Sequence, residues 1–203
     1  MNKAIYSNLS NITQKWVDLL IPLTGDYTIR LSASELARQA GIPQQTGARH
    51  LDNLAGAGLI EYERQGRNKL FYLDLKKQTG KIIINIAENQ KALYLISFAK
   101  INAILNEILR ECESMLVFGS YASLRFDKES DLDLIIFNCR NKNKIKKIKD
   151  LHPLEINEHY STYAEFKKVL SSRNALALEV AKNHVIFGNV SMLVEILTEA
   201  KSS

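Results

Sequence analysis

The first third of the chain shows helical spacing of apolar residues followed by strand-like alternation. A pair typical of a capping box, Ser32 and Glu35, opens the second of three predicted helices. Turn residues Gln65 to Asn68 separate two alternating runs, which predicts a β-hairpin. The expected bounds are residues 11–23, 33–40 and 44–55 for the helices, and 59–64 and 69–73 for the strands. This part is therefore predicted to be three helices and a hairpin.

The rest of the chain begins with helical spacing over residues 78–112, as one helix or two. Short apolar strands and amphipathic helices then follow, with a basic helical stretch over residues 140–151 among them. The expected strands are residues 115–118, 132–137, 154–160 and 185–187, and the expected helices are residues 163–170, 175–183 and 190–200. The pattern predicts a small sheet surrounded by helices.

Composition places the chain among ordinary globular proteins. It has 203 residues, of which 46% are hydrophobic and 24% charged, so we expect one large domain or two small ones. Polar residues interrupt every apolar run before it reaches 18 residues, which predicts no membrane span. Two cysteines are too few for a disulfide framework or a zinc cage. We therefore expect a cytoplasmic protein.

Charge is spread along the chain with a slight basic bias. The formal net charge is +5, and residues 1–78 contribute +3 of it, from ten Lys and Arg against seven Asp and Glu. This excess is compatible with an acidic partner such as nucleic acid, without requiring one.

The stretch with the clearest chemistry follows the predicted strand 115–118. Gly119 lets the backbone approach a ligand closely, and Ser120 adds a hydroxyl at the start of a helical turn whose N–H groups favour phosphate. Asp131 and Asp133 stand two apart on a predicted strand, so both carboxylates project from one face. Two like charges this close favour a hard divalent cation, above all Mg²⁺. A phosphate cradle beside a dicarboxylate is suited to phosphoryl or nucleotidyl transfer.

Gly119-Ser120, ten further residues and then Asp131-Leu132-Asp133 resembles the signature of the polymerase-beta-like nucleotidyltransferase superfamily, in its minimal nucleotidyltransferase branch. The similarity covers Ser114 to Gly188. It implies a third acidic metal ligand on the following strand, which we assign to Glu155, with Glu158 as the alternative. It also implies Mg²⁺ or Mn²⁺ as cofactor and a nucleoside triphosphate substrate, expected to be ATP.

The sequence departs from that signature directly after the Gly-Ser pair. The family usually shows Arg-Gly there, and this chain has Ser123-Leu124 with Arg125 next. The resemblance therefore implies that Gly119, Ser120 and Arg125 bind the nucleotide, while Asp131, Asp133 and Glu155 form the catalytic metal site.

The N-terminal part resembles winged helix-turn-helix regulators over Thr13 to Leu75. The third helix is expected to enter the DNA major groove, and the hairpin turn is expected to contact phosphate or the minor groove. The predicted DNA-binding residues are Gln44, Gln45, Thr46, Arg49, His50, Arg64, Arg67, Asn68 and Lys69. A winged helix used only for protein contacts is the alternative.

Together these patterns predict an α+β protein. We expect a winged helix-turn-helix domain over residues 1–78, a helical connector over 79–112, and a polymerase-beta-like nucleotidyltransferase domain with a small mixed sheet over 113–203. The expected function is Mg²⁺-dependent transfer of a nucleotide from a triphosphate to a hydroxyl acceptor, with double-stranded DNA as a partner. Two alternatives stay open: a DNA-binding regulator with a nucleotide-sensing or inactive transferase domain, and an antitoxin-like component acting on a partner protein. A homodimer through the connector is also left open.

Overall fold

The computed structural model describes residues 14–172 and 174–199. The predicted start of the first helix, residues 11–13, and the predicted last residue of the final helix, residue 200, lie outside this part. The chain divides into two compact units, residues 1–90 and 91–203, and each is described by itself. The division falls inside the expected connector, and the predicted domain boundaries at residues 78 and 112 stay predictions.

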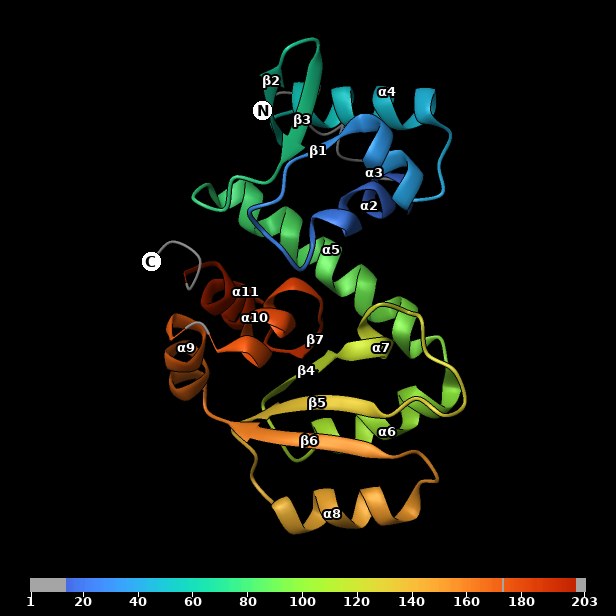
Figure 1. The fold of residues 1–203 in the computed structure, drawn as a ribbon, viewed down its shortest axis with the longest axis vertical. Helices are drawn as coiled ribbons and strands as arrows, with labels where there is room; N and C mark the ends of the chain where they lie inside the picture. Colours follow the sequence, from blue (N-terminus) through green and yellow to red (C-terminus); the bar gives the residue numbers. More distant parts are fainter. Residues whose placement is uncertain (1–13, 173, 200–203) are drawn as a thin grey trace, which may run out of the picture. The chain divides into compact units, whose positions relative to one another are not determined.

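The described part of the first unit, from residue 14 on, contains the α-helices α2, α3 and α4 and a three-stranded antiparallel sheet of order β1-β3-β2 (Figure 1). Ser32 and Glu35 form the predicted capping box at the start of α3. The helix α5, Gln78–Ile96, begins in this unit and ends in the second. The other elements are α2 Gln14–Leu20, η1 Ile21–Leu23, β1 Leu31–Ser32, α3 Ala33–Gln39, α4 Gln44–Gly56, β2 Glu61–Gln65 and β3 Asn68–Tyr72. The three predicted helices and the predicted hairpin appear in the predicted order, and β1 adds a third strand to the hairpin.

The helices α3 and α4 of the helix-turn-helix pack closely against each other at Gly47. A Cβ atom on Gly47 of α4 would lie 2.7 Å from the Cβ of Ala37 on α3, closer than two such atoms pack. Leu36 and Leu51, from the two helices, are fully buried. The glycine that weakens α4 as an isolated helix thus allows the two helices to approach each other.

The second unit has a four-stranded sheet of order β6-β5-β4-β7 (Figure 1). Strands β5 and β6 are parallel, and the other neighbours are antiparallel, so the sheet is mixed as predicted. The strands are β4 Ser114–Phe118, β5 Leu132–Phe137, β6 Ile156–Ser161 and β7 Val185–Gly188. The helices are α6 Ala99–Leu109, α7 Gly119–Ala122, α8 Lys142–Leu151, α9 Tyr163–Ser171, α10 Ala175–Lys182 and α11 Val190–Glu199. The predicted α+β class is confirmed.

The two faces of this sheet have different roles. Leu132, Leu134 and Ile136 of β5 belong to a core that also contains apolar residues of α6 and α8. The alternate residues Asp133, Ile135 and Phe137 face the opposite side of the sheet. On that side the Phe137 ring lies against the two aromatic rings of α9. Asp133 is thus the polar end of an otherwise apolar strand face.

Within the described residues, none of the helices alone is long and apolar enough to cross a membrane. The pair α5 and α6 meets the length and composition criteria only when both are counted together across a sharp bend.

Candidate functional site

The turn after β4 brings the main chain against a carboxylate. Gly119 has φ +69°, the left-handed region that glycine adopts most readily. A Cβ atom at this position would lie 2.4 Å from Oδ2 of Asp133. A side chain at this position would therefore push the Asp133 carboxylate aside, whereas glycine lets the main chain lie next to it.

Asp131 and Asp133 lie side by side and are joined through a third residue. Both are half-buried, and Asp133 stands opposite Phe118 of β4 and beside Asn157 of β6 in the sheet register. The Nδ2 of Asn157 donates to Oδ1 of Asp133 at 3.1 Å and to Oδ2 of Asp131 at 3.4 Å. The two predicted aspartates are therefore brought together, and an amide links them.

The structure does not bring the predicted third acid to this pair. Glu155 precedes β6, its carbonyl accepts a hydrogen bond from the Leu132 N–H, and its side chain is exposed. Glu158 forms an ion pair with Lys149 of α8. Across residues 14–172 and 174–199, His, Cys, Asp and Glu side chains form no group of three suited to a metal ion. Glu155 as a ligand stays a prediction.

The donor set at the aspartate pair nevertheless suits one hard divalent cation. Mg²⁺ is commonly held by one or two carboxylates together with substrate phosphates. The Asn157 amide already places its N–H hydrogens, which carry partial positive charge, between the two carboxylates. Asp131 and Asp133 would hold such an ion, and its positive charge would neutralise theirs.

The segment that departs from the family signature has an unusual backbone. Leu124 has φ +54°, a left-handed conformation that is uncommon for a residue with a side chain. This is the position where the resembled signature has glycine. Arg125 donates its backbone N–H to the Ser120 carbonyl, and its side chain is exposed. The turn thus keeps a glycine-like shape without glycine.

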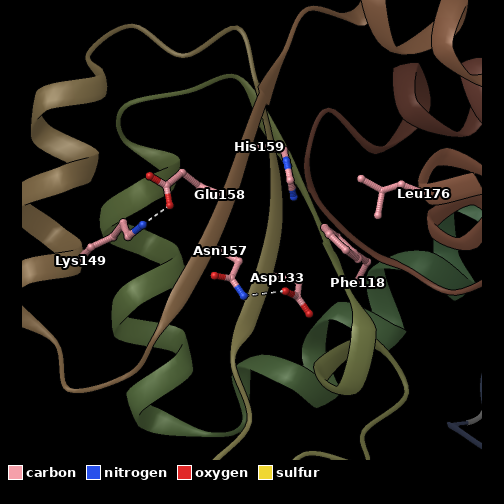
Figure 2. A pocket seen from close by; sticks show the side chains of 7 residues that line it. All are labelled: Phe118, Asp133, Lys149, Asn157, Glu158, His159 and Leu176. Atoms are coloured by element: carbon pink, nitrogen blue, oxygen red, sulfur yellow. Dashed lines mark hydrogen bonds and ion pairs between the residues drawn. The ribbon is translucent and has the colours of Figure 1, made fainter. Parts of the chain in front are cut away.

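A cavity of about 470 Å³ opens beside Asp133 (Figure 2). Its walls come from β4, β5, β6, α8 and α10, and of the two aspartates Asp133 lines it. The lining residues are Phe118, Asp133, Lys149, Asn157, Glu158, His159 and Leu176. The cavity therefore combines an aromatic and an aliphatic side chain with polar groups next to the carboxylates.

Sequence reasoning missed Asn157 and His159. Residues two apart on a strand share a face, so Glu155, Asn157 and His159 have the same parity and the pattern alone does not choose among them. The register of β6 against β5 decides, because it sets Asn157 beside Asp133 and His159 beside Ile135. The sequence shows which residues of this segment share a face, but it does not show how β6 is aligned with β5.

The first unit presents most of its predicted DNA-binding side chains outward. Gln44, Gln45 and Arg49 of α4 are exposed, and Thr46 is half-buried. His50 differs, because its Nδ1 accepts a hydrogen bond from Trp16 Nε1 at 2.7 Å. Burial, followed by the positive charges of Arg49 and Lys15, lowers the pKa of His50. His50 therefore has a structural contact in addition to any role on the surface.

The hairpin between β2 and β3 forms the predicted wing. Gln65 and Asn68 pair across it, which leaves Gly66 and Arg67 as a two-residue turn. Arg64, Arg67 and Asn68 are exposed. Lys69 is already engaged, since its Nζ lies 2.7 Å from Asp52 and 4.6 Å from the centre of the Tyr62 ring.

Comparison with protein families agrees with both parts of the structure. Residues 30–63 match the family model described as a helix-turn-helix domain, and residues 98–187 match the one described as a nucleotidyltransferase domain. The chain contains a helix-turn-helix domain followed by a nucleotidyltransferase domain. Searches among curated proteins and among solved structures found no match.

The nucleotidyltransferase match covers the whole aspartate site. It contains Gly119, both aspartates and Asn157, and it ends within β7. The helix-turn-helix match contains α3 and α4 and ends before the turn of the wing. In general terms, the two domains support a DNA-binding nucleotidyltransferase that uses a nucleoside triphosphate.

Proposed function

We propose that this protein is a Mg²⁺-dependent nucleotidyltransferase that transfers a nucleoside monophosphate from a triphosphate, expected to be ATP, to a hydroxyl acceptor. The observation that carries the proposal is the meeting of Asp131 and Asp133 beside the main chain of Gly119. A cytoplasmic location and Mn²⁺ as a substitute for Mg²⁺ belong to the same proposal.

Each part of the site has a distinct task in this proposal. The Gly119 backbone and the Ser120 hydroxyl bind phosphate oxygens, and the exposed Arg125 supplies a positive charge for the triphosphate. Asp131 and Asp133 hold Mg²⁺, which supplies charge neutralisation at the transferring phosphate. The acceptor oxygen bonds to the α-phosphorus, the bond to the pyrophosphate oxygen breaks, and the hydroxyl proton passes to a carboxylate or to water.

The test measures transfer of labelled nucleotide from each of the four common triphosphates with Mg²⁺ and with Mn²⁺. Replacing both aspartates, Asp131→Asn with Asp133→Asn, should abolish transfer while the thermal unfolding curve stays cooperative. Asp150→Asn removes an exposed carboxylate of α8 and serves as the matched control. Equal transfer by the double variant and the wild type would refute the metal role.

One observation favours a second candidate function. The group that links the two aspartates is the neutral amide of Asn157. A site with two carboxylates can bind a magnesium–nucleotide complex, yet it has less negative charge with which to activate an acceptor. A DNA-binding regulator that senses a nucleotide without transferring it is therefore the alternative, and it predicts nucleotide binding by the wild type with no transfer product.

We also propose that the helix-turn-helix domain binds double-stranded DNA through α4 and the wing. The exposure of Gln44, Gln45 and Arg49 on one helix supports base contacts, because Gln and Arg pair with adenine and guanine edges in the major groove. Fluorescence anisotropy with a random set of labelled duplexes tests this proposal. The triple variant Gln44→Ala, Gln45→Ala, Arg49→Ala should lose sequence preference, and an unchanged preference would contradict it.

A further inference from the structure

Asn157 occupies the position from which a side chain reaches both aspartates. It is the lateral neighbour of Asp133 on the adjacent parallel strand, so the sheet register fixes its placement. Figure 2 shows its amide directed at Asp133, and its Nδ2 lies within hydrogen-bond distance of both carboxylates. The placement of Asn157 beside Asp133 is therefore fixed by the sheet, while Asp131 lies in the segment just before β5.

Among the described residues, the protein itself contributes two carboxylates to this site, before any nucleotide phosphate adds its own charge. Asn157 is neutral, Glu158 is paired with Lys149, and the exposed Glu155 does not join the aspartate pair. One divalent cation balances the charge of Asp131 and Asp133. A second cation about 4 Å away, as in two-metal sites, would meet repulsion four times that between unit charges and no further carboxylate.

We infer that the aspartate site takes a single divalent cation, between Asp131 and Asp133, and that the neutral Asn157 is what prevents a second one from binding. The inference rests on the proposed function and deepens it. When the cation is bound, the Asn157 amide has to turn its oxygen toward the ion, because its N–H groups would otherwise face positive charge. Asn157 is thus a residue that sets how many metal ions this domain uses.

The test counts bound Mn²⁺ by electron paramagnetic resonance, with the full chain and one equivalent of a non-hydrolysable ATP analogue. Wild type should bind one Mn²⁺ per chain, and Asn157→Asp should bind two. Asn143→Asp adds the same charge on the exposed surface of α8 and should still bind one. Two ions in wild type, or one in Asn157→Asp, would overturn the inference.

Thermal unfolding gives a second readout that does not depend on catalysis. Without metal, Asn157→Asp should unfold at a lower temperature than wild type, because three carboxylates then repel one another. Saturating Mn²⁺ should raise its midpoint more than that of wild type, since a ligand that binds only the folded state stabilises it. A smaller Mn²⁺ response in Asn157→Asp than in wild type would contradict the inference.

The transfer assay separates this inference from the proposed function. Transfer by a wild type that binds two Mn²⁺ would leave the proposed function standing and refute the role of Asn157. Absence of Mn²⁺ from both proteins would refute both. If the inference holds, Asn157→Asp should also bind metal ~10-fold more tightly, a change typical of groups around a metal site.

Discussion

Trp16 donates its indole N–H to Nδ1 of His50 at 2.7 Å, and this bond joins α2 to the helix proposed to enter DNA. The two ring centres lie 6.0 Å apart with the planes inclined by 60°. Because Nδ1 accepts a hydrogen, it cannot carry a proton at the same time. His50 therefore has to be neutral for the bond to persist, which makes the first unit sensitive to pH.

We predict that the first unit loses stability as pH falls from about 6.5 through the lowered pKa of His50. The pKa of His50 is lowered in the folded state, so the unfolded chain binds the proton more readily. The contribution of the bond is complete above the unfolded pKa of about 6.5, and it is lost as pH falls from there through the folded pKa. The loss should reach about 1 kcal/mol, the net value of one hydrogen bond.

Urea unfolding followed by fluorescence measures this loss, because Trp16 is the one tryptophan of the sequence. His50→Gln should flatten the dependence of the unfolding free energy on pH between 7.5 and 5. His152→Gln, in the second unit, serves as the control and should leave that dependence of the Trp16 signal unchanged. An equally steep pH dependence in His50→Gln would show that another group is responsible.

Gly47→Ala is predicted to destabilise the first unit even though alanine favours helices. Alanine gains about 1 kcal/mol of helix propensity over glycine. The added Cβ, however, would lie 2.7 Å from the Cβ of Ala37, and overpacking of this kind costs about 1–3 kcal/mol. We expect a net loss of about 1 kcal/mol in urea unfolding.

Gly56→Ala provides the matched control, since Gly56 is also in α4 and a Cβ there meets nothing within 4 Å. It should leave the unfolding free energy unchanged or raise it by up to about 1 kcal/mol. If both substitutions stabilise the protein equally, the close contact between α3 and α4 does not constrain Gly47.

Leu124→Gly is predicted to stabilise the second unit. Leu124 has φ +54°, which costs a residue with a side chain about 1–2 kcal/mol. Its side chain is 45% exposed, so only part of its apolar surface loses contacts. Glycine also gives the unfolded chain more freedom, which offsets about 0.4–1 kcal/mol of the gain.

These two backbone contributions leave an expected net gain of about 0–1.6 kcal/mol in thermal unfolding of the full chain. Leu124→Ala keeps the Cβ atom that causes the strain, so it should show no gain. A destabilised Leu124→Gly would mean that the Leu124 side chain contributes more than its exposure suggests.

Local pattern was sufficient to predict most elements of this protein and the meeting of the two aspartates, although Asp131 lies just before β5 and not on it. Alternation along β5 and the Gly119-Ser120 pair at the end of β4 are encoded within a few residues, so they could be read directly. The choice among Glu155, Asn157 and His159 depends on the pairing of β6 with a strand more than twenty residues earlier, and no local pattern records it.

The same limit explains Gly47 and Leu124. The sequence shows that glycine weakens α4, but the need for it arises from Ala37 on another helix. The left-handed backbone at Leu124 is imposed by the turn between β4 and β5, against the ordinary preference of leucine. In each case a contact made in the tertiary structure overrides a local preference.

Removal of a wing arginine should change the salt dependence of DNA binding more than removal of the neighbouring lysine. Arg67 is exposed in the two-residue turn of the hairpin, whereas Lys69 contacts Asp52 and the Tyr62 ring. Each phosphate contact contributes about 0.9 to the slope of log affinity against log salt. Arg67→Ala should therefore reduce the slope by about 0.9, and Lys69→Ala should reduce it by less.

Fluorescence anisotropy titrations at salt concentrations from about 50 to about 300 mM measure these slopes. Lys81→Ala removes an exposed cation of α5 outside the hairpin and is the control expected to match wild type. Equal slopes for Arg67→Ala and wild type would place the wing away from the phosphates. Affinity independent of salt in the wild type itself would exclude phosphate contacts and favour a winged helix that binds protein.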